Sequence, residues 1–151
     1  MEPTSEDTAI AALIAEFYAA VSGPAGPRDL AREQRLFLPG AHLMRTGVDA
    51  DGRPWIKVMT SEEYVADTAP FFAANSFYER DAALQVERFG QIAWARSVYE
   101  ARRRPEDREL AKRGVNFLQL YWDGERWWIA AVIWADERPD LPLPAEWFSP
   151  A

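Results

Sequence analysis

The chain has 151 residues, of which 48% are hydrophobic and 27% charged, as is typical of one globular domain spanning 1–151. Its formal net charge of −7 repels phosphate backbones and anionic lipid heads, so we expect neither nucleic-acid nor membrane binding. Without cysteine there is no disulfide or thiolate nucleophile, and one histidine cannot build the usual zinc sites. The acidic first residues do not resemble a signal peptide, and no apolar run is long enough to span a membrane; we expect a cytoplasmic protein.

The first half of the chain carries helical signals. Capping residues followed by apolar residues at helical spacing predict helices over 6–22 and 29–36. A third helix should open at Thr60 or Ser61, where two glutamates follow the capping hydroxyl. Pro70 should kink or shorten that helix, because proline cannot donate the backbone hydrogen bond.

The second half changes to strand signals separated by turn residues. Asp123-Gly124 is a strong hairpin turn, and neighbouring strands joined by such turns form an antiparallel meander. The proline-rich segment from Pro139 onward cannot be a central strand, and we expect it to lie extended against the domain through Trp147 and Phe148. The expected strands span 41–45 and 55–59, which could form a hairpin, and then 77–88, 91–103, 110–122 and 126–136.

The last strand is apolar on both faces. An antiparallel sheet with helices on one side normally shows water a polar second face, so this strand needs a second cover. A partner subunit and the wall of a ligand cavity are the two candidate covers. Strict alternation places Trp127, Ile129, Ala131 and Ile133 on one face and Trp128, Ala130, Val132 and Trp134 on the other.

Polar residues are embedded among apolar neighbours in the two preceding strands. Arg96 and Glu100 share one face of strand 91–103 with apolar residues. Asn116 and Gln119 likewise have apolar neighbours within strand 110–122. An unpaired buried polar group costs about 1–3 kcal/mol. Each of these residues must therefore be paired, hydrated or in contact with a ligand.

Four segments resemble the nuclear transport factor 2-like superfamily, which includes SnoaL-like and ketosteroid isomerase-like proteins. Glu16–Val21 and Asp123–Ile129 are similar to recurring segments of the superfamily, and Arg113–Leu120 and Trp134–Arg138 are similar to a bacterial branch of unassigned function. The resemblance implies an α+β fold in which a cone-shaped, curved antiparallel β-sheet packs on two to three N-terminal helices. It also implies a cavity between helices and sheet and a homodimer formed through the open sheet face. The same scaffold carries isomerases, dehydratases, cyclases and non-catalytic binding domains, so it does not decide the chemistry.

Candidate acid–base residues come from two considerations. His42, the only imidazole, could be a general acid or base; the alternative is a satisfied or surface histidine. Isomerases of this scaffold pair a carboxylate with a tyrosine donor, and Glu100 or Asp136 with Tyr18 or Tyr99 supply those residue types. The alternative for Glu100 is an ion pair with a neighbouring arginine, namely Arg96, Arg102 or Arg113.

Candidate ligand contacts are polar groups of the sheet and large aromatic walls. Asn116, Gln119 and Tyr99 could bind a polar group of a ligand, while Trp55, Trp94 and Trp134 could form apolar walls. Tryptophans that fill the core or a dimer contact are the alternative. The basic residues of 102–113 could bind phosphate, but interleaved acids favour a self-paired hairpin tip.

Three functions remain compatible with the sequence. The first is a dimeric domain that binds a small apolar molecule, and the second is an isomerase, dehydratase or cyclase acting by general acid–base catalysis. The third is a protein-interaction module without a ligand. None of the three requires a cofactor or metal, and the sequence has no phosphate-binding loop, dinucleotide fingerprint or nucleophile elbow.

Overall fold

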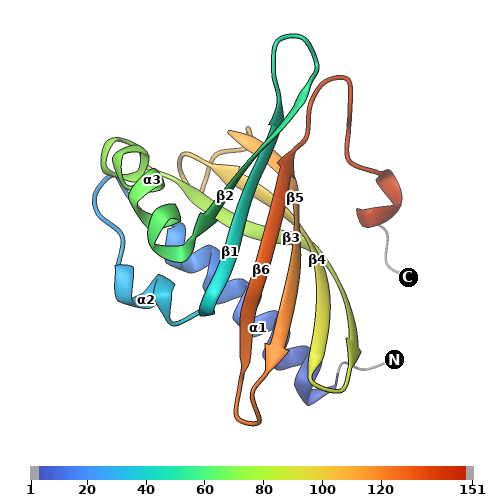
Figure 1. Cartoon of the computed structure of the whole chain (residues 1–151). Helices are drawn as coiled ribbons and strands as arrows, with labels where there is room; N and C mark the ends of the chain where they lie inside the picture. The colour runs from blue at the N-terminus through green and yellow to red at the C-terminus, as the bar shows by residue number, and fades with distance from the viewer. Residues whose placement is uncertain (1–3, 149–151) are drawn as a thin grey trace.

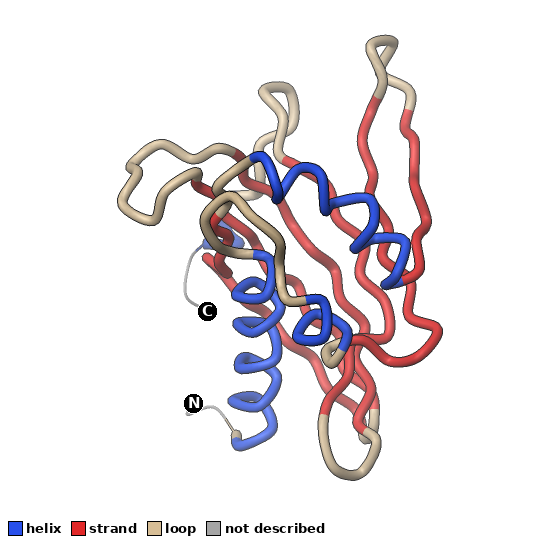
Figure 2. Tube along the Cα trace, turned by 90° about the vertical axis from the view of Figure 1, so that its left-hand side faces the viewer, coloured by secondary structure: helices blue, strands red, loops and turns tan. Residues whose placement is uncertain are grey.

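The structure, a computed structural model, describes residues 4–148 and contains three helices, six strands and a terminal 3₁₀ turn (Figure 1). The helices all precede the four long strands of the meander, and they lie on one side of the sheet (Figure 2). The elements are α1 (Ser5–Val21), α2 (Leu30–Gln34), β1 (Phe37–Val48), β2 (Pro54–Thr60), α3 (Ser61–Ala74), β3 (Tyr78–Phe89), β4 (Ile92–Arg102), β5 (Lys112–Trp122), β6 (Trp127–Asp136) and η1 (Ala145–Phe148).

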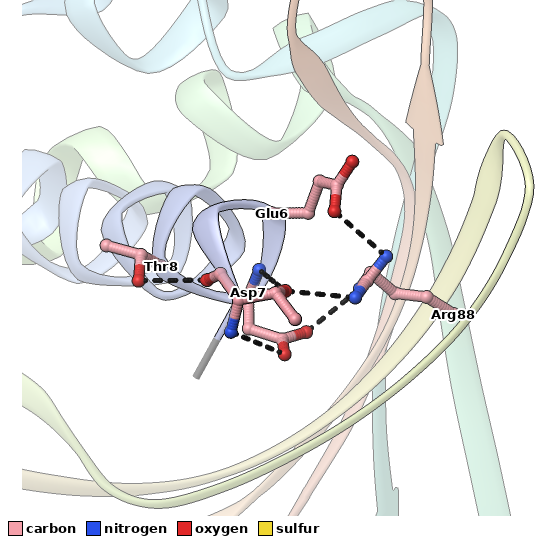
Figure 3. A network of polar contacts seen from close by, with 5 residues as sticks. Glu6, Asp7, Thr8 and Arg88 are labelled. Carbon is pink, nitrogen blue, oxygen red and sulfur yellow. Dashed lines mark hydrogen bonds and ion pairs between the residues drawn. The ribbon is translucent and has the colours of Figure 1, made fainter. Parts of the chain in front are cut away.

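The first helix begins where the capping signal predicts. Thr4 caps α1 and forms a reciprocal capping box with Asp7, which satisfies two otherwise unpaired backbone amides. Arg88 of β3 joins this cap: its guanidinium donates to Asp7 at 2.9 Å and lies 3.5 Å from the carboxylate of Glu6 (Figure 3). The start of α1 is thereby tied to the end of β3.

The third helix also begins at its predicted cap but does not end at its proline. Thr60 and Glu63 form a second capping box. Pro70 lies inside α3, and the helix continues to Ala74. Proline removes one backbone donor from such a helix, so the last turn depends on packing, which Phe71, Phe72 and Phe77 provide as a cluster of aromatic rings.

The six strands form one curved, mostly antiparallel sheet in the order β2-β1-β6-β5-β4-β3. The predicted meander is confirmed, as is the β1–β2 hairpin, which projects at the top of Figure 1. One pairing was not predicted: β1 runs parallel to β6. The chain reaches this pairing because α3 carries it from the edge strand β2 to the opposite edge strand β3, so that the meander returns to β1.

The side of the sheet that faces the helices, called here the concave face, forms the core. α1 packs against β3 and β6, and α3 packs against β1 and β2. The predicted assignment of side chains to the two faces of β4 and β5 is confirmed by their pairing, in which Ala95 faces Leu118 and Ser97 faces Asn116. The concave-face side chains are buried, and on the convex face Val98 and Val115 are buried too. Fully enclosed members of this core include Ile10, Ile14, Leu43, Ala95, Leu118 and Ile129.

The predicted assignment of side chains to the two faces of the last strand, β6, is wrong beyond Ile129. Leu120 of β5 pairs with Ile129 and Gln119 pairs with Ala131, so Ala130 is an extra residue that forms a β-bulge. The bulge exchanges the two faces. Val132 and Trp134 therefore share the concave face with Trp127 and Ile129, while Ala131 and Ile133 lie on the opposite, convex face.

The end of the chain lies on part of the convex face. The guanidinium of Arg96 lies 4.5 Å from the ring centre of Trp147, and that ring meets Phe117 edge-on at 6.2 Å. Glu137 fixes the approach to this contact, because it receives two hydrogen bonds from Arg113 and one from the backbone of Leu143. The predicted tail also includes Pro150, which lies outside the described residues.

No helix within residues 4–148 is both long and apolar enough to cross a membrane. In the same range, no group of three or more histidine, aspartate or glutamate side chains is placed to hold a metal ion.

Candidate functional site

A pocket of about 500 Å³ lies between α3 and the concave face of the sheet. The apolar part of its wall is mainly aromatic, and the ring of Tyr64 on α3 meets that of Trp134 on β6 edge-on, with ring centres 6.0 Å apart. Apolar walls of this kind bury a ligand, while a few convergent polar groups orient it. The main apolar wall residues are Phe17, Leu43, Tyr64, Phe72, Phe77 and Trp134.

Tyr99 is the central polar group of the pocket. Its side chain is 2% exposed, and its hydroxyl donates to the carboxylate of Asp136 at the rim. Burial, reinforced by the negative charge of Asp136, raises the pKa of Tyr99, so the phenol stays protonated. Lys112 lies near both partners, 3.7 Å from the Asp136 carboxylate and 5.7 Å from the centre of the Tyr99 ring.

Gly114 makes this arrangement possible. It pairs with both Tyr99 and Asp136 on the concave face, and a Cβ at this position would collide with the Tyr99 hydroxyl. Only glycine leaves room for the tyrosine to reach the carboxylate. A glycine inside a strand is often a mark of such a close approach.

Glu79 lines the same pocket and is the titratable group that the sequence reasoning missed. It lies opposite Ala101 on the concave face of β3, and no hydrogen bond joins its carboxylate to another residue between 4 and 148. Burial raises the pKa of Glu79 to about 7, opposed by the charge of Lys112. Glu79 and Asp81 are two carboxylates at alternate positions of β3, and this spacing could have pointed to the site. They lie opposite Ala101 and Tyr99, on the concave face.

Tyr18 and Asn116 form the inner end of the site. Asn116 lines the pocket and donates through its amide to the hydroxyl of Tyr18 at 2.9 Å. The Tyr18 hydroxyl also lies 2.6 Å from the hydroxyl of Ser97. Burial raises the pKa of Tyr18 far above its usual range, and its hydrogen bonds with Ser97 and Asn116 only partly offset that rise.

Three of the residues selected from the sequence lie on the other side of the sheet. His42 pairs with Ala131, and Gln119 pairs with the same residue from the opposite strand; both side chains are exposed on the convex face. Glu100 also lies there and forms ion pairs with Arg80 at 2.7 Å and Arg102 at 3.7 Å. The structure therefore brings Tyr99, Asn116, Trp134 and Asp136 together with Tyr18, and it separates His42, Glu100 and Gln119 from them.

Trp55 occupies a neighbouring hollow of the β1–β2 hairpin. Its ring lies over Gly47, where a Cβ would come within 2.5 Å of it. Trp55, Trp134 and Asp136 line a depression of about 790 Å³, which adjoins the pocket beneath α3 and shares Trp134 with it. Two basic residues of the β4–β5 tip are paired within the tip, since Arg104 binds the Asp107 carboxylate at 3.1 Å and Arg102 donates to the backbone carbonyl of Asp107.

Two other features have some properties of a site. Glu33 of α2 is 3% exposed and has one carboxylate oxygen without a partner; burial raises its pKa to about 7, but it lines neither the pocket beneath α3 nor the depression at Trp55. A groove of about 900 Å³ runs between α1 and β3, and Asp81 and Arg102 are among its charged lining residues. Tyr18 and Tyr78 are its aromatic lining residues, fewer than in the pocket beneath α3, and Glu79 lines both.

Comparison with solved structures places the architecture among known folds. A protein of unknown function with a cystatin-like fold from Nostoc punctiforme aligns with a TM-score of 0.69 and 18% identity, over 95% of this chain and 100% of that one. A nuclear transport factor 2-like protein of unknown function from Shewanella baltica aligns with a TM-score of 0.62 and 16% identity, over 91% and 99% of the two chains. This chain has the nuclear transport factor 2-like fold. The resemblance predicted from the sequence is thus confirmed for the fold.

A protein from Shewanella frigidimarina that carries the provisional name ketosteroid isomerase also shares the nuclear transport factor 2-like fold. It aligns with a TM-score of 0.59 and 19% identity, over 87% of this chain and 98% of that one. At such identities the likeness concerns the fold alone. No protein-family model and no curated protein sequence matches the chain.

Proposed function

We propose that this domain binds a small, mostly apolar molecule in the pocket beneath α3. The observation that carries the proposal is the convergence of Tyr99, Asn116 and Glu79 on a pocket of about 500 Å³ with an aromatic wall. A rigid apolar wall supplies affinity through burial, and the few polar groups fix the orientation of one polar substituent. The nuclear transport factor 2-like fold is compatible with this use.

Native mass spectrometry against a library of lipophilic metabolites tests the proposal, with two tryptophan variants as a matched pair. Trp134→Ala removes an aromatic wall of the pocket, while Trp94→Ala removes a tryptophan from the convex face. Loss of a buried aromatic contact weakens binding by roughly tenfold or more, so Trp134→Ala should lose the ligand and Trp94→Ala should keep it. A pocket that stays empty across the library contradicts the proposal.

We also propose that a second copy of the chain covers the open part of the convex face. The C-terminal segment covers the region around Phe117, while Ile56 and Val58 on β2 remain 54% and 53% exposed. Both residues point to the convex side, since they pair with Thr46 and Met44. Sedimentation should show a dimer that Val58→Lys dissociates and that Lys57→Val, one residue along on the concave side, leaves intact; a monomeric wild-type protein contradicts this.

General acid–base catalysis is the second candidate function, and the pKa of about 7 at Glu79 favours it. A carboxyl group that titrates near neutral pH can both take and return a proton. In such a reaction, Glu79 would remove a proton from the carbon beside a carbonyl group. The single hydroxyl proton of Tyr99 would turn from Asp136 to the enolate oxygen and donate a hydrogen bond to it. Return of that proton to the γ-carbon would complete an isomerisation in which no other group is consumed.

A β,γ-unsaturated ketone whose conjugated product absorbs in the ultraviolet tests the catalytic candidate. Removing a general base lowers the rate by about 10²–10⁴-fold, so Glu79→Gln should abolish most of the turnover. Glu100→Gln is the matched control, because that carboxylate lies on the convex face and is paired with Arg80. Turnover that is equal in the two variants excludes Glu79 as the base.

A further inference from the structure

A chain of four polar side chains crosses the concave face beneath α1. The amide nitrogen of Asn116 lies 2.9 Å from the Tyr18 hydroxyl, which lies 2.6 Å from the Ser97 hydroxyl. The Ser97 hydroxyl in turn lies 2.5 Å from a carboxylate oxygen of Asp81. Tyr18, Ser97 and Asn116 are 1%, 0% and 4% exposed, so water cannot readily replace any of these three partners.

The protons that these four side chains carry determine which group donates in each of the hydrogen bonds that join them. An ionised carboxylate only accepts, so the single proton of Ser97 must be donated to Asp81. Ser97 then accepts the single proton of Tyr18, whose oxygen is left as an acceptor. The group of Asn116 that faces Tyr18 must therefore be its amide nitrogen, although the two ends of an asparagine amide are nearly equal in shape.

This order leaves the carbonyl oxygen of Asn116 without a donor. None of the hydrogen bonds among residues 4–148 reaches that oxygen, and Asn116 lines the pocket beneath α3. A carbonyl group that lines a pocket without a donor favours a ligand that supplies one. If the amide were reversed, the same position would instead offer a donor and favour a ligand that accepts.

We propose that Asp81, acting through Ser97 and Tyr18, holds the Asn116 amide so that its carbonyl oxygen faces the pocket and selects ligands with a hydroxyl or N–H group. This inference rests on the proposed ligand-binding function and adds the class of ligand. Asp81 is a positioning residue in this scheme. Asn116 is the residue that contacts the ligand.

Two variants change the direction of the chain without removing Asn116. Asp81→Asn has nearly the shape of the natural residue, but its amide can either donate to Ser97 or accept from it, so the direction is no longer imposed. Ser97→Ala removes the acceptor of Tyr18, which then donates to the Asn116 carbonyl oxygen and turns the amide nitrogen toward the pocket. Glu100→Gln is the control, since it makes a similar change on the convex face of the adjacent strand.

The probes are 1-indanol, which can donate a hydrogen bond, and 1-indanone, which can only accept one. We expect wild type and Glu100→Gln to prefer the alcohol. The dissociation constant of the ketone divided by that of the alcohol, measured at pH 8, should fall by about 3- to 10-fold in Asp81→Asn. In Ser97→Ala the preference should pass to the ketone. An unchanged ratio in both variants overturns the inference, whereas failure of both probes to bind wild type counts against the ligand-binding function itself.

A measurement without ligand determines the orientation of the Asn116 amide even if neither probe binds. In wild type, the side-chain amide protons of Asn116 should give a strong nuclear Overhauser effect to the ring protons of Tyr18, since nitrogen and hydroxyl are 2.9 Å apart. The effect should persist in Glu100→Gln and weaken clearly in Ser97→Ala, where the amide reverses. An effect of equal strength in all three proteins shows that the chain does not orient Asn116.

Discussion

Glu79 and Glu100 lie on adjacent strands, one residue apart in register, yet they point to opposite faces of the sheet. Glu100 on the convex face is neutralised by Arg80 and Arg102. The carboxylate of Glu79 on the concave face has no hydrogen-bonding partner among the described residues, lines the pocket beneath α3 and has its pKa raised to about 7 by burial. The comparison teaches that the face of the strand, more than the type of residue, separates a structural ion pair from a group able to do chemistry.

The largest expected contrast between the two faces concerns packing. Leu118 on the concave face is completely buried, so Leu118→Ala should cost about 2–5 kcal/mol of unfolding free energy. Val58 on the convex face is 53% exposed, and Val58→Ala should change the stability of the monomer by no more than about 0.5 kcal/mol. Urea unfolding at low protein concentration measures both; equal losses contradict the assignment of the faces.

Glu79→Gln should increase the stability of the protein by an amount that depends on pH, unlike a substitution of Glu100 on the convex face. Because the pKa rises from 4.5 in the unfolded chain to about 7 in the folded protein, the stability that protonated Glu79 contributes is complete below pH 4.5. It is lost as pH rises through 7, by at most about 3 kcal/mol. Glu79→Gln should therefore stabilise the protein at pH 8 and have little effect at pH 4.

Thermal unfolding of both variants at the two pH values checks this, with Glu100→Gln as the control. Since Glu100 loses two ion pairs in that variant, it should not gain stability at pH 8. A gain of equal size in the two variants contradicts the difference between the faces.

Gly114→Ala should disturb the concave site with a smaller cost. The added methyl group would collide with the Tyr99 hydroxyl, and overpacking of this kind costs about 1–3 kcal/mol. We expect the phenol to lose its hydrogen bond to Asp136, which the hydroxyl proton resonance of Tyr99 reports. An unchanged resonance and unchanged stability contradict the close approach.

The smallest expected effect concerns the C-terminal segment on the convex face. Trp147→Ala removes a cation–π contact with Arg96 and an edge contact with Phe117, each worth about 0.5–1 kcal/mol. The core does not depend on this contact, so ligand binding should be unaffected. Hydrogen exchange should increase in residues 141–147 and remain unchanged in β4; faster exchange throughout the sheet contradicts a peripheral role.

Much of the fold could be predicted because local signals agree with it. Thr4 and Thr60 cap their helices as expected, and the turn at Asp123-Gly124 joins the last two strands of the predicted meander. The parallel pairing of β1 with β6 could not be predicted from the sequence, because it joins segments about 90 residues apart and leaves no local pattern. Pro70 was expected to disturb its helix, but the helix continues to Ala74.

The site was less predictable than the fold because a single bulge changes which side chains meet. Alternation alone separates Trp134 from Ile129, and the extra residue Ala130 puts them on the same face. The faces of Tyr99 and Asn116 were predicted correctly because their strands alternate regularly. Glu79 was missed because the facing of strand 77–88 depends on its pairing with Ala101, which local sequence does not show.

The central claim is that the concave pocket, and not the convex face, receives the ligand. Its most direct test is a titration with 1-indanol followed in the indole N–H region of a ¹H–¹⁵N spectrum, where the seven tryptophans give separate signals that single Trp→Phe variants assign. We predict that the signal of Trp134 moves while those of Trp94 and Trp147 stay in place. Movement of Trp94 or Trp147 with Trp134 unchanged would contradict the account.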